Sequence, residues 1–96
     1  MARGYIIAHV TVTDPEIYAG YVARNADIFA RHGGRFLVRG GASLAPEGPM
    51  KERHVIVEFP DFASARAAYR SPEYQENLKL RLAGAKSDVV LVEGVE

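Results

Sequence analysis

The sequence predicts an α+β domain whose strands and helices follow the order β-α-β-β-α-β. Three observations support this order. Apolar runs rich in β-branched residues recur four times, and stretches with apolar residues at three- and four-residue spacing lie between the first and second runs and between the third and fourth. A third is the segment 53–75, RHVIVEFPDFASARAAYRSPEYQ, which joins a strand, a Pro-Asp stop, an alanine-rich helix and a Ser-Pro restart.

The first strand and the first helix have clear boundaries. Residues 5–12 (YIIAHVTV) are β-branched and aromatic with partial alternation, as in a strand. Asp14 opens a helix because its carboxylate accepts from the free N–H groups of the first turn, and Pro15 suits the first helical position. Gly33-Gly34 ends the helix, since glycine adopts the left-handed conformation freely. The helix carries one apolar stripe of Ile17, Tyr18, Tyr21, Val22, Ile28 and Phe29.

Two further strands follow, separated by a loop. Residues 35–39 (RFLVR) form the second strand, which Gly40-Gly41 ends or bulges. Residues 42–52 hold two prolines and a glycine and are predicted to be a surface loop. Residues 53–59 (RHVIVEF) form the third strand.

The last part of the chain is a broken helix followed by a strand. Asp61 caps a helix over 62–70, and Ser71-Pro72 breaks and restarts it, with Ser71 as the new cap. Ala83-Gly84 ends the helix, and residues 88–93 (DVVLVE) form the fourth strand. One face of the restarted helix is predicted to carry Tyr74, Leu78 and Leu82.

This order is the ferredoxin-like arrangement, with an antiparallel sheet. Right-handed crossovers place strand three between strands one and two, and strand four beside strand one. The length of 96 residues fits a single domain over 1–96.

The predicted sheet has one purely apolar face and one mixed face. The apolar face is expected to carry the helices, which leaves the mixed face without cover from its own chain. Such a face exceeds the apolar patch that a soluble monomer tolerates, so a homodimer packed sheet to sheet is expected. A monomer with a tolerably apolar face is the alternative. The residues assigned to the mixed face are Tyr5, Ile7, His9, Thr11, Leu37, Arg39, His54, Ile56 and Glu58.

Composition excludes several classes of function. Twelve basic and 12 acidic residues balance, and no basic run exists, so neither nucleic acid nor a membrane is expected as a partner. No cysteine is present, which excludes disulfides and thiolate chemistry. No glycine-rich phosphate loop is present, and no cofactor is expected. A cytoplasmic protein is predicted, because no run resembles a signal peptide or membrane span.

Four segments that together span nearly the whole chain are 33–41 (GGRFLVRGG), 57–60 (VEFP), 69–75 (YRSPEYQ) and 90–94 (VLVEG). On these, the chain resembles the uncharacterised family known as domain of unknown function 1330, in the dimeric α+β barrel superfamily. The resemblance implies a homodimer with a pocket on the sheet face. It supplies no catalytic residues, because the family has no agreed activity. Superfamily relatives include cofactor-independent monooxygenases, muconolactone-type isomerases and haem-binding peroxidases, so fold alone is a poor guide to function.

The mixed face holds the predicted catalytic residues. His9 and Glu58 are candidate bases, since an imidazole beside a carboxylate can move protons near neutral pH. Arg39 and His54 are candidate substrate-binding residues, and Arg39 could hold a carboxylate or enolate through its guanidinium. The alternative is that Arg39 and Glu58 form a purely structural pair.

Asn25, Tyr21 and Tyr69 complete the predicted substrate-binding set, as residues at the edge of the pocket. The alternatives are an Asn25 bonded to backbone or water, and a Tyr69 that clamps the helix break onto the sheet. No metal site is expected. A facial triad of His9, His54 and Glu58 is the weaker alternative, because no ligand spacing demands it.

The predicted function is that of a small enzyme acting on a small organic acid or ketone, by proton transfer or cofactor-independent oxygenation. The alternatives are a non-catalytic binding module and a purely structural dimer. Substrate and physiological role do not follow from the sequence.

Overall fold

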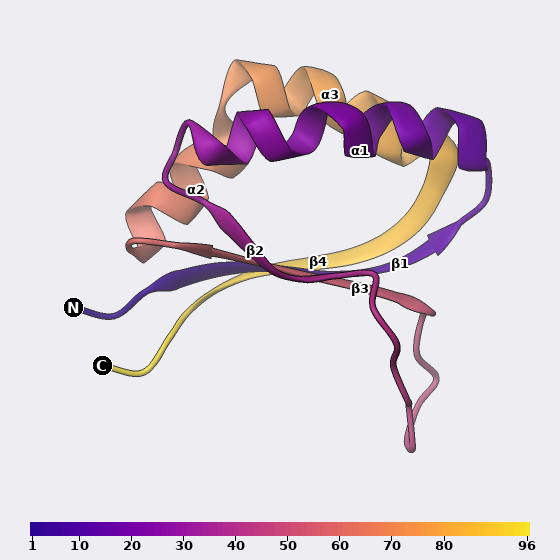
Figure 1. The fold of residues 1–96 in the computed structure, drawn as a ribbon, viewed down its shortest axis with the longest axis horizontal. Coiled ribbons are helices and arrows are strands. Elements are labelled where there is room, and N and C mark those ends of the chain that lie inside the picture. Colours follow the sequence, from indigo (N-terminus) through magenta and orange to yellow (C-terminus); the bar gives the residue numbers. More distant parts are fainter.

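The computed structural model describes residues 1–96 and confirms the predicted ferredoxin-like order, with the restarted helix counted separately. The strands form one antiparallel sheet in the order β2-β3-β1-β4 (Figure 1). They are β1 (Gly4–Val12), β2 (Arg35–Arg39), β3 (Arg53–Phe59) and β4 (Ala85–Glu93). The helices are α1 (Pro15–Ala30), α2 (Phe62–Arg70) and α3 (Pro72–Gly84).

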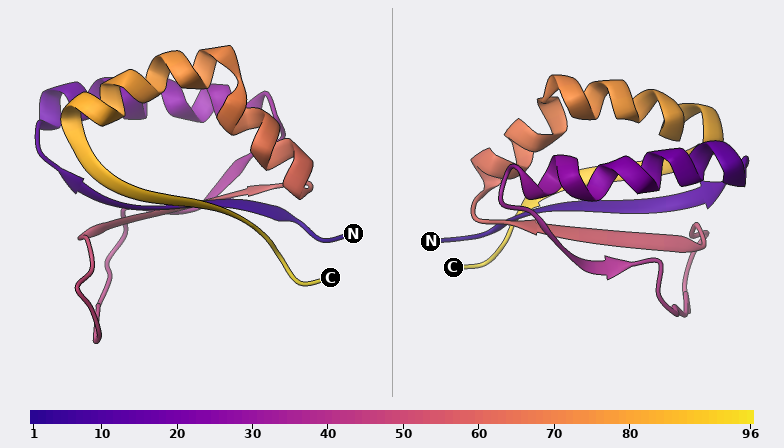
Figure 2. Two further views of the ribbon diagram at one scale, coloured as in Figure 1. Left: turned by 180° about the vertical axis from the view of Figure 1, so that it is seen from behind. Right: turned by 45° about the horizontal axis from the view of Figure 1, so that its top comes forward.

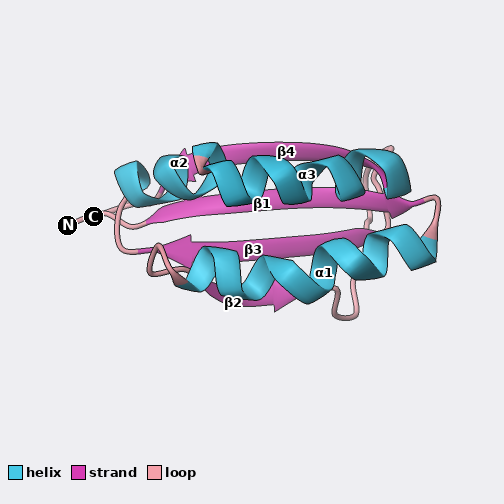
Figure 3. Cartoon of the chain, turned by 90° about the horizontal axis from the view of Figure 1, so that it is seen from above, coloured by secondary structure: helices cyan, strands magenta, loops and turns pink.

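All three helices cover one face of the sheet. Seen from above, α1 lies over the β2–β3 side, whereas α2 and α3 lie over the β1–β4 side (Figure 3). Helices α1 and α3 pack against each other over the middle of the sheet. None of the helices is long and apolar enough to cross a lipid bilayer.

The predicted caps begin the helices as expected. The Asp14 carboxylate accepts from backbone N–H groups in the first turn of α1, and Asp61 does the same for α2. The Ser71 hydroxyl accepts from the N–H of Tyr74 at 3.2 Å and donates to the Ala68 carbonyl at 2.8 Å, so it serves both helix ends at the break. Gly33, with φ of +81°, ends the turn after α1 in the conformation that favours glycine.

The core lies between the sheet and the helix layer. Alternate residues of β1 and β3 point toward the helices and are buried, and aromatic rings from α1 and α3 fill the space above them. Each fully buried large apolar side chain contributes roughly 1.5–3 kcal/mol relative to exposure. The main members of this core are Ile6, Val10, Tyr18, Tyr21, Phe29, Val57, Phe59 and Tyr74.

Two predictions about the last helix and strand are wrong. Strand β4 begins at Ala85 rather than at residue 88, because the Gly84 carbonyl accepts from two N–H groups just before α1 and fixes the junction directly after α3. Leu82 is 67% exposed, while Asn77 and Arg81 are buried in its place. Helix α3 therefore presents Asn77 and Arg81 to the interior beside Tyr74, while Leu78 is only partly buried against the core.

A β-bulge in β2 corrects the predicted position of Arg39. Phe36 pairs with Val57, but Val38 pairs with Ile56, so Leu37 is an extra residue in the strand. Every later side chain changes face as a result. Arg39 pairs with Val55 and lies on the helix-covered side, not on the mixed face.

No element of the chain covers the other face of the sheet, called here the open face (Figures 1 and 2). The arm, residues 40–52 between β2 and β3, leaves the sheet on this side and points away from the helices. The open face carries Tyr5, Ile7, His9, Thr11, Val38, His54, Ile56, Glu58, Asp88, Val90 and Val92.

Candidate functional site

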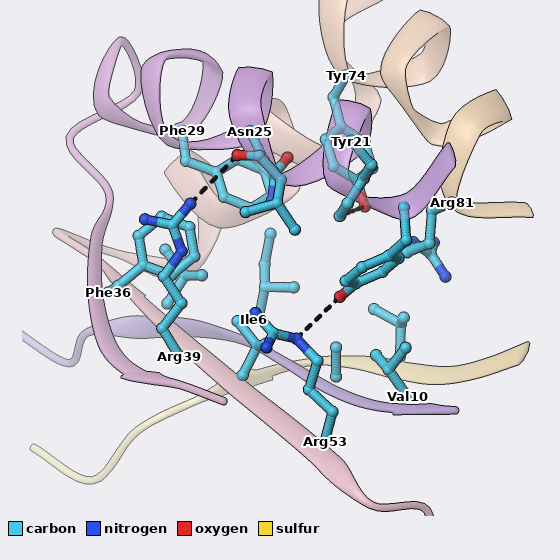
Figure 4. A pocket seen from close by; sticks show the side chains of 16 residues that line it. Ile6, Val10, Tyr21, Asn25, Phe29, Phe36, Arg39, Arg53, Tyr74 and Arg81 are labelled. Carbon is cyan, nitrogen blue, oxygen red and sulfur yellow. Dashed lines mark hydrogen bonds between the residues drawn. The ribbon is translucent and has the colours of Figure 1, made fainter. Parts of the chain in front are cut away.

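A small cavity lies between the helix-covered side of the sheet and helices α1 and α3 (Figure 4). Its volume is about 30 Å³, which is enough for bound water but far below the roughly 300–1,000 Å³ of a typical ligand pocket. Twelve of its 16 lining residues are hydrophobic, and the lining contains no carboxylate and no histidine. The four polar residues are Asn25, Arg39, Arg53 and Arg81.

Aromatic rings form the helix-side wall of the cavity. Phe29 stacks on Tyr74 with ring centroids 5.1 Å apart, and it packs against Phe36 at 6.3 Å. Tyr21 meets Tyr74 edge-on at 6.2 Å. These rings come from β2, α1 and α3, so three elements hold the wall in place. A wall of this kind favours a planar apolar group.

Arg81 is a buried cation without an anion. Its side chain comes from α3, the residue is 5% exposed, and its Nε has no hydrogen-bond partner. No carboxylate lies within ion-pair distance of it. Its polar neighbours are neutral phenols: the ring of Tyr21 lies 5.9 Å from the guanidinium carbon, and Tyr74 also interacts with the guanidinium. Burying a charge costs several kcal/mol unless it is paired, so Arg81 creates a demand for a negative group.

Asn25 adds a second unsatisfied group to the cavity lining. It is 5% exposed, its Oδ1 has no partner, and it lies on α1 one turn after Tyr21. Nearby, Asn77 has a structural contact, because its Nδ2 donates to the Tyr21 carbonyl at 3.1 Å and joins α3 to α1. The Oδ1 of Asn25 has no such contact.

Tyr21 and Tyr74 share a hydrogen bond between their hydroxyls, 2.8 Å apart. Burial, with a smaller effect of the neighbouring Tyr74, raises the pKa of Tyr21 far above its usual range. The Tyr21 hydroxyl therefore stays protonated near neutral pH. It can donate or accept a hydrogen bond, but it does not act as an anionic base there.

Arg39 and Arg53 close the mouth of the cavity. Arg39 Nη2 donates to the Val22 carbonyl at 3.2 Å, and Arg53 Nε donates to the Tyr18 hydroxyl at 3.2 Å (Figure 4). Both arginines thus reach from the sheet to α1. Arg53 also lines an outer groove of about 470 Å³, and Tyr18 and Val22 likewise line both the groove and the cavity.

Gly40 makes room for the Arg53 guanidinium. A Cβ at position 40 would lie within van der Waals overlap of Arg53 Nη1, and φ at Gly40 is +70°. The backbone conformation favours glycine at this position, and a side chain here would displace the Arg53 guanidinium. The predicted glycine stop after β2 has a direct role in positioning a cavity residue.

The structure divides the predicted site residues between the two sides of the sheet. Arg39, Asn25 and Tyr21 line the cavity, whereas His9, His54 and Glu58 lie on the open face. His9 and His54 are paired across β1 and β3, with their Nδ1 atoms 2.8 Å apart. Chemistry that needs Arg39 beside His9 or Glu58 is not supported by this geometry.

Glu58 pairs with different partners from those predicted. Its carboxylate is 3.0 Å from Arg35 Nε and 4.0 Å from Arg3 Nε, and it accepts from the Tyr5 hydroxyl at 3.3 Å. The predicted pair with Arg39 does not form. Glu58 is four residues along β3 from His54, about 13 Å away, so the facial triad with His9 does not assemble. No group of three or more potential ligand side chains is arranged to hold a metal ion.

Tyr69 supports the site from outside. It is half-buried and packs on Tyr74 with centroids 5.1 Å apart, and it does not line the cavity. This packing agrees with the alternative of a clamp at the helix break, and the role of Tyr69 in substrate binding stays a prediction.

Sequence reasoning missed Arg53 and Arg81 as cavity residues. A signal for Arg81 exists, because Tyr74, Asn77 and Arg81 recur at helical spacing and share a face. The same helix also contains Leu78 and Leu82. Because apolar residues are usually buried, these leucines, and not Arg81, were predicted to lie on the inner face of the helix.

The sequence profile for Domain of unknown function (DUF1330) matches residues 3–95. The chain belongs to the DUF1330 family. No curated protein matches the chain with significance.

Solved structures that resemble this DUF1330 protein share its fold. One is a protein of unknown function from Rhodopseudomonas palustris, with 23% identity, a TM-score of 0.79, and coverage of 99% of this chain and 84% of that one. SnoaB, a cofactor-independent oxygenase from Streptomyces nogalater, has 18% identity and a TM-score of 0.68, with coverage of 100% and 96%. A dimeric ferredoxin-like protein of unknown function from Thermobifida fusca has 17% identity and a TM-score of 0.63, with coverage of 99% and 92%.

Proposed function

We propose that this DUF1330 protein binds a small organic anion with an apolar body in the cavity between sheet and helices, and acts on it as an enzyme. The observation that carries the proposal is Arg81, a buried guanidinium with no counter-ion in an aromatic cavity without carboxylates. A bound carboxylate or enolate would supply the missing negative charge. Arg39 and Arg53 at the mouth would attract the same anion.

The lining favours chemistry in which the substrate carries the negative charge. The cavity contains neither histidine nor carboxylate, and Tyr21 stays protonated. Its arginines would bind the enolate or phenolate form of an acidic substrate that has already lost its proton to water. In an oxygenation without cofactor, the substrate itself supplies the electrons to dioxygen, so a stabilised substrate anion is what such a site must provide. The fold shared with a cofactor-independent oxygenase supports this class of reaction.

A second candidate function is sequestration of an organic anion without turnover. The observation that favours it is the size of the cavity, about 30 Å³ with both mouth arginines bonded to α1. An organic ligand can enter or leave only if these side chains move, so binding and release are slow. Slow release suits a protein that stores the ligand as well as one that converts it.

Ligand binding is tested with a matched pair of probes, benzoate and benzamide, which share shape but differ in charge. Benzoate should raise the melting temperature of the protein, because a ligand bound only to the folded state stabilises it. Benzamide should raise it much less. In the variant Arg81→Met the benzoate shift should vanish, while the exposed Arg24→Met variant should retain it.

The same variants separate a binding role from a structural one. Removing a buried unpaired charge should leave the unfolding free energy of Arg81→Met unchanged or higher by about 1–3 kcal/mol. A large loss of stability in Arg81→Met, or equal shifts with benzoate and benzamide, would contradict the proposal. Oxygen uptake with phenols and 1,3-diketones then distinguishes enzyme from binder.

We further propose that the protein is a homodimer whose open faces meet. Val90 and Val92 are 50% and 41% exposed there, beside half-buried Tyr5, Ile7 and Ile56. Contiguous apolar surface of this kind is typical of an interface. The dimeric ferredoxin-like neighbour supports the proposal. His9 and His54 would then lie at the interface, where their catalytic and binding roles remain predictions.

A further inference from the structure

The arm is the connection between the two arginines that close the cavity. Arg39 is the last residue of β2 and Arg53 is the first residue of β3, with residues 40–52 between them. The arm projects away from the helices on the side of the open face (Figures 1 and 2). Any displacement of the arm therefore acts directly on the backbone of both mouth arginines.

The arm has little support from its own chain. Residues 41–52 make no backbone–backbone hydrogen bond, and all residues of the arm except Lys51 are exposed. Leu44 is 89% exposed and Met50 is 48% exposed. Pro46 and Pro49 limit its conformational freedom, so ordering it against another surface costs less entropy. These properties are those of a segment that binds a partner.

The root of the arm is fixed over the open face. The Thr11 hydroxyl donates to Glu52 Oε2 at 2.8 Å, and Lys51 forms an ion pair with Asp88. Thr11 lies on β1 and Asp88 on β4, so these contacts tie the arm across the face that the proposed dimer would cover.

The length of the arm indicates that it contacts a second copy of the chain. Thirteen residues that run out and back reach roughly 20 Å at about 3.3 Å per residue. Sheets packed face to face lie about 10 Å apart. A second copy on the open face must therefore lie alongside the arm, and the arm reaches past its sheet.

We infer that the arm seats against a second copy of this chain and thereby sets the spacing of Arg39 and Arg53 at the cavity mouth. The inference rests on the dimer and the anion cavity proposed above. Leu44 makes the apolar contact with the second copy. Because the arm is bonded to the sheet at Lys51 and Glu52, the position of the arm affects the position of Arg39 and Arg53 at the mouth of the cavity. Dimer formation and anion binding are thus coupled through one segment.

Two variants test the seating of the arm. Leu44→Asp places a charge on the arm, and its matched control Leu82→Asp places one on the outer face of α3, where Leu82 is 67% exposed. A second variant replaces residues 42–50 by Asn-Gly. Sedimentation velocity should show dimer dissociation constants raised at least about tenfold in Leu44→Asp and in the shortened chain, but not in Leu82→Asp. Circular dichroism checks that each variant is folded.

Calorimetric titration with benzoate tests the coupling to the mouth. At concentrations where the wild type is dimeric and Leu44→Asp is monomeric, benzoate should bind the variant several-fold more weakly. Unchanged dimerisation of folded Leu44→Asp and of the shortened chain would overturn the inference and leave the dimer standing. Lost dimerisation with unchanged benzoate affinity would overturn the link to the mouth. If the wild type is a monomer, both the proposed dimer and the inference about the arm are overturned. If the wild type is a dimer that does not bind benzoate, the proposed anion cavity and its link to the arm are overturned.

Discussion

At the residue scale, the charged side chains of this protein are stabilised in different ways. Arg35 is exposed and pairs with Glu58 at 3.0 Å. Arg39 lies over the ring of Phe36, 4.3 Å from its centroid, and donates to a backbone carbonyl. Arg81 is buried with no anion at all. Arg35 and Arg39 therefore have interaction partners within the protein. Arg81 has no anionic partner, so a bound anion would supply the charge that neutralises it.

A double-mutant cycle checks this assignment of partners. Arg35→Ala and Glu58→Gln should couple by up to about 1 kcal/mol in unfolding free energy, since the pair is close but Arg35 is largely exposed. Arg39→Ala and Glu58→Gln should be additive, because the two side chains lie on opposite sides of the sheet. Chemical denaturation of the single and double variants measures both couplings. Coupling between Arg39 and Glu58 would contradict the bulge in β2.

The site could be predicted from the sequence only in part, and Arg39 shows why. Its residue type suggested an anion-binding role, which stays a prediction, and the structure places Arg39 in the lining of the cavity. Its face depended on one extra residue, Leu37, and this bulge contains no glycine or other residue that would reveal it. Because strand side chains alternate with period two, one unseen residue moved Arg39 from His9 and Glu58 to the opposite side.

At the element scale, helix starts follow from local chemistry, whereas helix faces depend on the whole fold. Asp14, Asp61 and Ser71 cap their helices as predicted, since capping needs only nearby N–H groups. The buried face of α3 was predicted only in part: Tyr74 and Leu78 pack toward the core, but Leu82 is exposed, and Asn77 and Arg81 face inward where they meet Tyr21 and the cavity. Tertiary contacts override the apolar pattern there.

The cap of α2 gives the protein a pH dependence. A hydrogen bond from the Ser64 N–H, 2.7 Å away, lowers the pKa of Asp61 below its usual range. A carboxylate with a lowered folded-state pKa contributes stability above its unfolded-state pKa and loses that contribution as the pH falls through the folded-state value. Asn at this position caps without a charge. The drop in unfolding free energy between about pH 7 and about pH 3 should therefore be smaller in Asp61→Asn than in the wild type.

Urea unfolding at the two pH values measures this drop, and Asp27→Asn, at an exposed position of α1, serves as the control. Equal acid sensitivity of wild type and Asp61→Asn would show that the cap does not respond to its charge.

At the scale of the whole molecule, element order was enough to predict the fold. The four strands, the helix break at Ser71-Pro72 and the sheet order all follow from runs, stops and right-handed crossovers. The cavity did not follow, because it forms where side chains from β1, β2, β3, β4, α1 and α3 meet. The sequence predicted a site on the open face, whereas the cavity lies on the helix-covered side of the sheet.

The cavity is tested most directly by a crystal structure of the protein with benzoate bound. The ring is expected between Tyr21, Phe29 and Phe36, with its carboxylate within hydrogen-bond distance of Arg81 and with Arg39 or Arg53 turned away from α1. Benzoate found only on the open face beside His9 and His54, with the cavity unchanged, would contradict the assignment of the site to the helix-covered side.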